Sequence, residues 1–107
     1  MSAKAKQGNE WPSVSGLYRT DDYLVLVDLK GKSETERPDF YILDLNDWKQ
    51  LVADERTRRP NITVDMLNRI SYPNGWKGLN VKPDAVVACK EQWHKIVSQI
   101  STERTAP

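Results

Sequence analysis

An acid and a base, Asp28 and Lys30, stand two residues apart at the end of an apolar run that begins at Tyr23. Such a short β-branched run is typical of a strand buried on both faces, and the two-residue period of a strand places both side chains on the same side of its end. A carboxylate there can bind Mg²⁺, and a lysine beside the metal can stabilise the charge that develops when a phosphodiester is hydrolysed. The same two residues can instead form a structural ion pair, and their spacing leaves both interpretations open.

Three arginines, Arg56, Arg58 and Arg59, form a second group with possible chemistry. They lie where the end of a predicted helix favours positive charge, and Pro60 prevents that helix from continuing. One interpretation is a solvated helix end. The other is a cluster that binds the phosphate groups of a nucleic acid.

Four tryptophans could stack on bases, but their surroundings differ. Trp48 and Trp93 lie on the apolar faces of predicted helices, which indicates that they belong to the core. Trp11 and Trp76 lie beside turns and are predicted to be at the surface. Trp76 is therefore added to the arginines as a candidate nucleic-acid-binding residue.

Composition excludes several classes of site. The chain has one cysteine, Cys89, and one histidine, His94, so it can form neither an internal disulfide nor a zinc site built on several cysteines or histidines. Any metal must be held by oxygen ligands. Sixteen basic and fifteen acidic residues give a net charge of +1, which does not by itself indicate a polyanionic partner. No apolar run approaches the length of a membrane span, and the amino end lacks the apolar core of a signal peptide, so we expect a cytoplasmic protein without a membrane partner.

The 107 residues predict one small domain with two polar ends. Residues 1–10 contain almost no large apolar side chain and are expected to form a flexible tail, and residues 101–107 a second one. Residues 11–100 then form a single α+β domain. The region is long enough to fold alone, although its core is small.

The expected elements begin with a hairpin. Residues 23–29 and 40–45 are both apolar, and the charged segment between them is too short for a helical crossover, so the two strands should pair antiparallel. Asn46 or Asp47 is expected to cap a helix whose apolar face contains Trp48. The sheet is thus predicted to be small and mainly antiparallel, with two or three helices packed against it.

The sequence predicts the secondary structure of the last third of the chain less clearly. Thr63 could cap a short helix over residues 64–70, but the β-branched start of that segment also allows a strand, and residues 62–81 are left open between helix and strand. A turn is predicted at Tyr72 to Gly75. Pro83 is expected to begin a last helix that extends to Ile100.

The strand Leu26-Val27-Asp28-Leu29-Lys30, the strand that begins at Asp39 and the helix near Trp48 together resemble the C-terminal half of a PD-(D/E)XK nuclease-like domain, the restriction-endonuclease fold. The resemblance covers about residues 16–57. It implies that Asp28 binds Mg²⁺ and that Lys30 helps to position or activate the attacking water. It also implies a sheet flanked by helices.

The pattern departs from that family in one respect. Members normally carry another metal-binding aspartate well upstream, yet only Glu10, Asp21 and Asp22 precede Asp28 here. The Pro-Asp pair at Asp39 comes after the D-x-K strand. One carboxylate is therefore missing or supplied by a second chain.

Three functions follow as hypotheses. The first is a nuclease-like domain with an incomplete site that binds nucleic acid or a protein partner in DNA processing. The second is a Mg²⁺-dependent nuclease completed by a homodimer or by a partner, and the third is a module for protein–protein interaction alone. A truncated sheet would leave unpaired strand edges, which favour self-association in each case.

Overall fold

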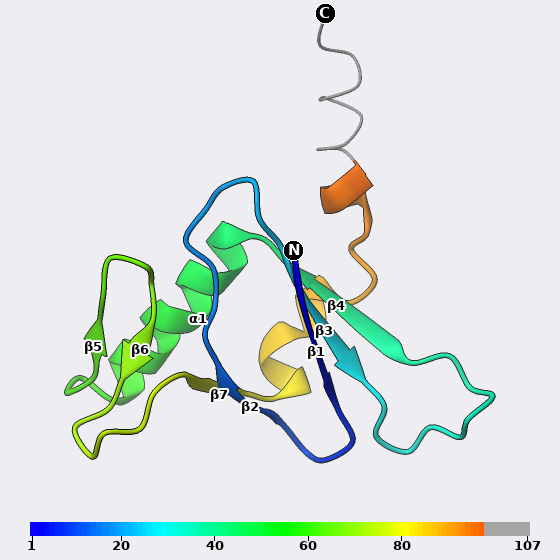
Figure 1. The fold of residues 1–107 in the computed structure, drawn as a ribbon, viewed down its shortest axis with the longest axis horizontal. Helices are drawn as coiled ribbons and strands as arrows, with labels where there is room; N and C mark the ends of the chain where they lie inside the picture. The colour runs from blue at the N-terminus through cyan, green and yellow to red at the C-terminus, as the bar shows by residue number, and fades with distance from the viewer. Residues whose placement is uncertain (98–107) are drawn as a thin grey trace, which may run out of the picture.

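The structure is a computed structural model that describes residues 1–97. It has an α+β fold, as the sequence predicted, and its strands form three small sheets beside the helix α1 (Figure 1). In chain order the elements are β1 (Ser2–Lys6), β2 (Trp11–Val14), β3 (Leu24–Asp28), β4 (Asp39–Leu43), α1 (Leu45–Arg58), β5 (Thr63–Val64), β6 (Ile70–Ser71), β7 (Leu79–Val81) and the 3₁₀ helix η1 (Pro83–Cys89). The expected tail at residues 101–107 lies outside the described residues.

The predicted hairpin is the centre of the fold. β3 and β4 pair antiparallel with Leu24 opposite Leu43 and Asp28 opposite Asp39. β3 is the middle strand of the three-stranded sheet β1-β3-β4, so both of its edges are paired. This explains its continuous apolar sequence, because side chains on both faces of a central strand are covered.

The expectation of a flexible tail over residues 1–10 is wrong for its first half. Ser2–Lys6 forms β1, which pairs parallel with β3. Four of its five residues are exposed, so hydrophobic burial is not what holds it. Its backbone completes the hydrogen bonding of β3, and the side chain of Lys6 forms an ion pair with Asp28 on that strand. The pattern of hydrophobic residues in the sequence indicates neither interaction.

Helix α1 starts earlier than predicted. Its N-cap is Asp44, whose carboxylate accepts a hydrogen bond from the backbone nitrogen of Asp47 at 2.9 Å. The Asp47 carboxylate accepts one in return from the backbone nitrogen of Asp44, also at 2.9 Å. This reciprocal capping box uses Asp in the place where Glu or Gln is usual, so Asp47 is part of the cap without being the cap residue. Trp48 lies fully buried on the inner face of the helix, as expected.

Residues 62–81 contain short strands and no helix. β5 and β6 form a small hairpin, and β7 pairs with β2. The alternative of a helix over residues 64–70 is wrong because the Asp65 side chain accepts hydrogen bonds from the backbone nitrogens of Leu67 and Arg69, which closes a turn. Asn68 completes this turn with a φ of 59°.

The predicted last helix is interrupted. Pro83 begins η1 as expected, but η1 ends at Cys89 and Glu91 adopts a φ of 56°. At this break the backbone nitrogen of Glu91 donates to the carbonyl oxygen of Phe40 at 2.8 Å, and Lys90 pairs with Tyr41 across the outer edge of β4. The helical conformation resumes only at residue 94, and residues 98–100 lie outside the described part. The chain therefore covers this sheet edge where a continuous helix was expected.

The two faces of the three-stranded sheet belong to different apolar clusters. The larger cluster contains Leu24 and Leu26 of β3 together with the buried face of α1 and residues of β2, β6 and β7. The smaller one contains Val25 and Ile42 and is covered by Trp93 and Ile96. The alternation of side chains along β3 therefore joins both halves of the core.

Candidate functional site

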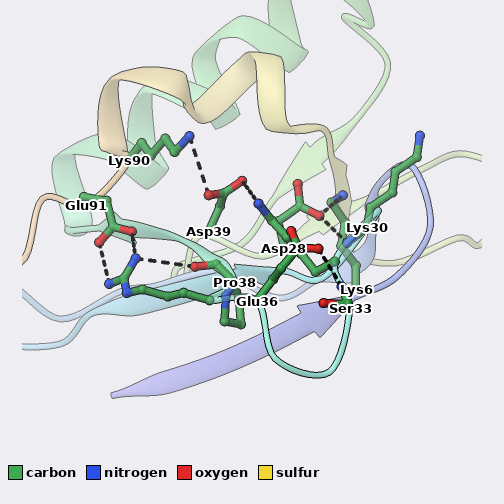
Figure 2. Close-up of polar contacts among 11 residues, drawn as sticks. Lys6, Asp28, Lys30, Ser33, Glu36, Pro38, Asp39, Lys90 and Glu91 are labelled. Carbon is green, nitrogen blue, oxygen red and sulfur yellow. Dashed lines mark hydrogen bonds and ion pairs between the residues drawn. The ribbon is translucent and has the colours of Figure 1, made fainter.

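Asp28 ends β3 in contact with a lysine that the sequence analysis did not consider. Its Oδ1 atom lies 2.8 Å from Nζ of Lys6, which comes from the neighbouring strand β1 (Figure 2). The side chain of Lys6 is only 2% exposed and that of Asp28 13% exposed. The same ammonium donates to the carbonyl oxygen of Gly8 at 2.9 Å and lies 4.9 Å from the ring centre of Trp11. The charged end of Lys6 is therefore enclosed by an aspartate, a carbonyl and an aromatic ring.

Lys30 does not join Asp28 as a second side chain of one site. β3 ends at Asp28, so the strand period that would have aligned the two side chains no longer applies. The backbone nitrogen of Lys30 donates to Asp28 Oδ1 at 3.0 Å, while its exposed ammonium contacts the side-chain oxygen of Asn9. Burial raises the pKa of Asp28, but the hydrogen bonds from Lys6 and from the Lys30 backbone outweigh it and hold that pKa below its usual value.

A second carboxylate, that of Asp39, lies on the strand beside Asp28. The two aspartates are directly opposite in the β3–β4 register, so their side chains leave the same face of the sheet. Lys90 (Figure 2) and Lys32 flank Asp39, each with an N–O distance of 3.6 Å. Like charges opposite each other destabilise a sheet, and the surrounding lysines offset this repulsion. The Pro-Asp pair at Asp39 was visible in the sequence, but its position opposite Asp28 followed only from the register.

We call Lys6, Asp28, Lys32, Asp39 and Lys90 the lysine–aspartate cluster. Its three ammonium groups and two carboxylates sum to a net charge of +1. A divalent cation would have to displace Lys6 from Asp28, or Lys32 and Lys90 from Asp39, before both carboxylates were free to bind it. Within residues 1–97, no group of three or more acidic, histidine or cysteine side chains is arranged to hold a metal. These donors do not fit Mg²⁺.

The loop between β3 and β4 is fixed to the segment that follows η1 by a charged pair. Arg37 contacts Glu91 through both carboxylate oxygens, with Nη2 to Oε2 at 3.0 Å. This contact, with the hydrogen bond from the Trp93 indole, lowers the pKa of Glu91 to about 2. Arg37 also lies over the ring of Phe40 at 4.9 Å. The loop that carries Lys32 therefore has a defined position.

A different surface brings together most of the residues predicted to bind nucleic acid. Arg58 and Arg59, at the end of α1, and Trp76, which precedes β7, line one open groove of about 940 Å³. The other lining residues are Glu10, Glu55, Tyr72, Asn74, Asn80, Lys82, Asp84 and Ala85. Arg56 is exposed on the same helix but is not part of this lining. We call this surface the arginine groove.

A buried carboxylate holds the two arginines of the groove. The side chain of Glu55 is 8% exposed, and its oxygens lie 3.2 Å from Nη2 of Arg58 and 3.9 Å from Nε of Arg59. The hydroxyl of Tyr72 donates to the same carboxylate. Burial and the hydrogen bond to Glu55 raise the pKa of Tyr72 to about 12. Because Glu55 is one turn before the arginines, it orients both guanidinium groups at the helix end.

The tryptophans are distributed between the core and the surface differently from the prediction. Trp76 is 49% exposed, as expected for a surface residue. Trp11 is fully buried, so its predicted surface position is wrong. Its indole nitrogen donates to the carbonyl oxygen of Val27 at 3.1 Å, and its ring packs edge-on against Tyr41. A tryptophan is stable in a core when its indole N–H donates to a carbonyl oxygen. A turn beside it in the sequence therefore does not show that it is exposed.

No family model, curated protein or solved structure matches this chain. Within residues 1–97, no helix has the length and apolar composition needed to cross a bilayer.

Proposed function

We propose that this chain is a non-catalytic module that binds a short single-stranded segment of nucleic acid in the arginine groove. The observation that carries the proposal is the meeting of Arg58, Arg59 and the half-exposed ring of Trp76 in one groove. A stacking surface beside cationic side chains is the combination that single-stranded nucleic acids require.

The chemistry of the groove favours a single strand over a duplex. Trp76 offers an aromatic face to an unpaired base, and such stacking contributes about 1 to 3 kcal/mol for each base. The guanidinium groups of Arg58 and Arg59 can bind phosphate oxygens through paired hydrogen bonds. Glu55 limits the motion of both arginines, which lowers the entropy lost on binding.

The acidic residues of the groove limit the affinity that we expect. Glu10 and Asp84 also line the groove and would repel a phosphate backbone. The groove has three cations for phosphate contacts, Arg58, Arg59 and Lys82, and two of them already contact the carboxylate of Glu55. For a single strand, three neutralised phosphates correspond to a slope of about −2 when the logarithm of the association constant is plotted against that of the salt concentration.

Binding is favoured over catalysis by the state of Asp28. A nuclease needs this carboxylate for a metal, whereas here Lys6 and the Lys30 backbone occupy its Oδ1 atom. The resemblance to the PD-(D/E)XK fold then concerns the architecture alone, without a complete metal site at Asp28. The arginine groove lies elsewhere, at the end of α1 and beside Trp76.

Fluorescence anisotropy of a labelled 12-nucleotide oligothymidylate, at about 50 mM salt, tests the proposal. We expect saturable binding that weakens at least tenfold when Arg58 and Arg59 are both replaced by Ala, because two of the three phosphate contacts are lost. Trp76→Ala should weaken binding by a similar factor through loss of stacking. Arg56→Ala is the matched control, because it removes the same charge from the same helix outside the groove.

Three results would contradict a single-strand site in the arginine groove. Equal losses from Arg56→Ala and from the double variant would indicate a general attraction to charge and contradict a groove site. A duplex of the same length that binds as tightly as the single strand would contradict the stacking role of Trp76. If no oligonucleotide binds, the module has a different ligand.

A further inference from the structure

The outer edge of β1 is open, while the opposite edge of the same sheet is covered. In the sheet order β1-β3-β4, Lys90 and Glu91 lie along the free side of β4. Within the described part of the chain, no strand pairs with the far side of β1, and Ser2 to Ala5 are all exposed (Figure 1). Natural proteins normally block such edges, and along the exposed stretch from Ser2 to Ala5 only Lys4 carries a charge.

Two hydrogen bonds show which backbone groups of β1 point away from the sheet. The backbone nitrogen of Ser2 donates to Tyr23 at 3.0 Å, and the carbonyl oxygen of Lys6 accepts from Leu29 at 2.8 Å. In a parallel ladder the residues that face the partner strand alternate, so Ser2, Lys4 and Lys6 bond to β3. The N–H and C=O groups of Ala3 and Ala5 therefore face outward. They offer two donors and two acceptors to an added strand.

The side chains of β1 indicate what kind of strand would fit. Ala3 and Ala5 are in register with Val25 and Val27 of β3, so their small methyl groups extend the apolar face of the sheet to its edge. Lys4 lies on the opposite face and forms no ion pair within residues 1–97. A matching strand would place an acidic residue beside Lys4 and apolar residues beside the two alanines.

A second copy of this chain fits the edge poorly. Antiparallel self-pairing that uses the outward groups of Ala3 and Ala5 in both copies sets Lys4 directly opposite its own counterpart. Like charges in this position destabilise strand pairing. We infer that the open edge of β1 receives an extended segment of a partner protein with an apolar-acidic-apolar pattern, which adds a fourth strand to the sheet.

Chemical-shift titration of the full chain with the capped peptide Thr-Val-Glu-Val-Thr tests this inference. The expected result is a saturable shift of the Ala3 and Ala5 amide signals. Ala5→Pro removes one outward N–H without touching the ladder to β3, and it should weaken binding at least tenfold. Lys4→Glu should reverse the charge preference, so that this variant binds the control peptide Thr-Val-Lys-Val-Thr more tightly than the acidic one.

Three outcomes would overturn the inference. The first is the absence of a saturable shift with the acidic peptide, and the second is equal binding of both peptides that Ala5→Pro leaves unchanged. The third is a concentration-dependent dimer, measured by sedimentation, that Ala5→Pro abolishes, since the edge would then belong to a second copy. Hydrogen exchange checks the geometry separately, because the amides of Ala3 and Ala5 should exchange faster than that of Lys4 in the free protein.

Discussion

Replacing Asp28 by Asn leaves the buried ammonium of Lys6 facing an uncharged group. Removing one partner of a buried ion pair typically costs about 3 to 5 kcal/mol, because the other charge remains desolvated. Here the carbonyl oxygen of Gly8 and the ring of Trp11 still face the ammonium, and the Asn oxygen can accept a hydrogen bond. We therefore expect Asp28→Asn to lower the free energy of unfolding by about 2 to 4 kcal/mol at pH 7.

The pH dependence of this loss has a defined direction. The pKa of Asp28 is lower in the folded protein than its unfolded value of 3.8, so its contribution to stability is fully present above pH 3.8. It declines as the pH falls below that value and is lost once the pH passes below the folded pKa. The difference between the wild type and Asp28→Asn should accordingly be large at pH 7 and should shrink progressively as the pH falls below 3.8.

Urea unfolding followed by circular dichroism at several pH values measures the effect. Asp39→Asn is the matched control, since this residue lies opposite Asp28 but is 30% exposed, with lysines at 3.6 Å. Its expected cost is below about 1 kcal/mol. A loss of less than about 0.5 kcal/mol for Asp28→Asn at pH 7 would refute the idea that a buried ion pair holds β1 to β3.

Three further predictions concern single residues. Gly16→Ala should destabilise the protein by about 2 to 5 kcal/mol in thermal unfolding, because its φ is 89° and an added methyl group would collide with the ring of Trp48. Tyr72→Phe removes the hydroxyl that donates to the buried carboxylate of Glu55 and should cost about 1.5 to 3 kcal/mol, and ultraviolet titration of the wild type should show one phenol that ionises near pH 12. Burial raises the pKa of Cys89 to about 11, so Ellman's reagent at pH 8 should react with the unfolded chain and much more slowly with the native one.

The part of the fold that the sequence predicts correctly rests on local patterns. The β3–β4 hairpin follows from two apolar runs joined by a short polar loop, and α1 follows from its apolar face and from the polar residues Asn46 and Asp47 near its start. Both patterns depend on residues that are close together in the sequence, so they can be recognised without knowledge of the tertiary structure. The position of the cap was misjudged because the capping box uses Asp47 in place of Glu or Gln.

The part that the sequence did not predict depends on distant contacts. β1 is too polar to resemble a buried strand, and its pairing with β3 brings Lys6 to Asp28 across 22 positions. The break at Glu91 occurs because the chain bonds to Phe40 on β4, which helical spacing cannot indicate. For the candidate site, residue types predicted Arg58, Arg59 and Trp76 one by one, whereas their meeting in one groove and the role of Glu55 required the fold.

The polarity of β1 has a consequence for the behaviour of the chain outside its native state. Val25 and Val27 of β3 carry the backbone groups that β1 covers, and the β3 side chains are almost entirely aliphatic. If proteolysis removed residues 1–6, this strand would become the sheet edge, with no lysine to discourage pairing with other chains. Asp28 would lose its buried partner in the same event. The polar strand β1 thus shields the aliphatic strand β3 from pairing with other chains. We expect the protein to aggregate when residues 1–6 are removed and to stay monodisperse when they are intact.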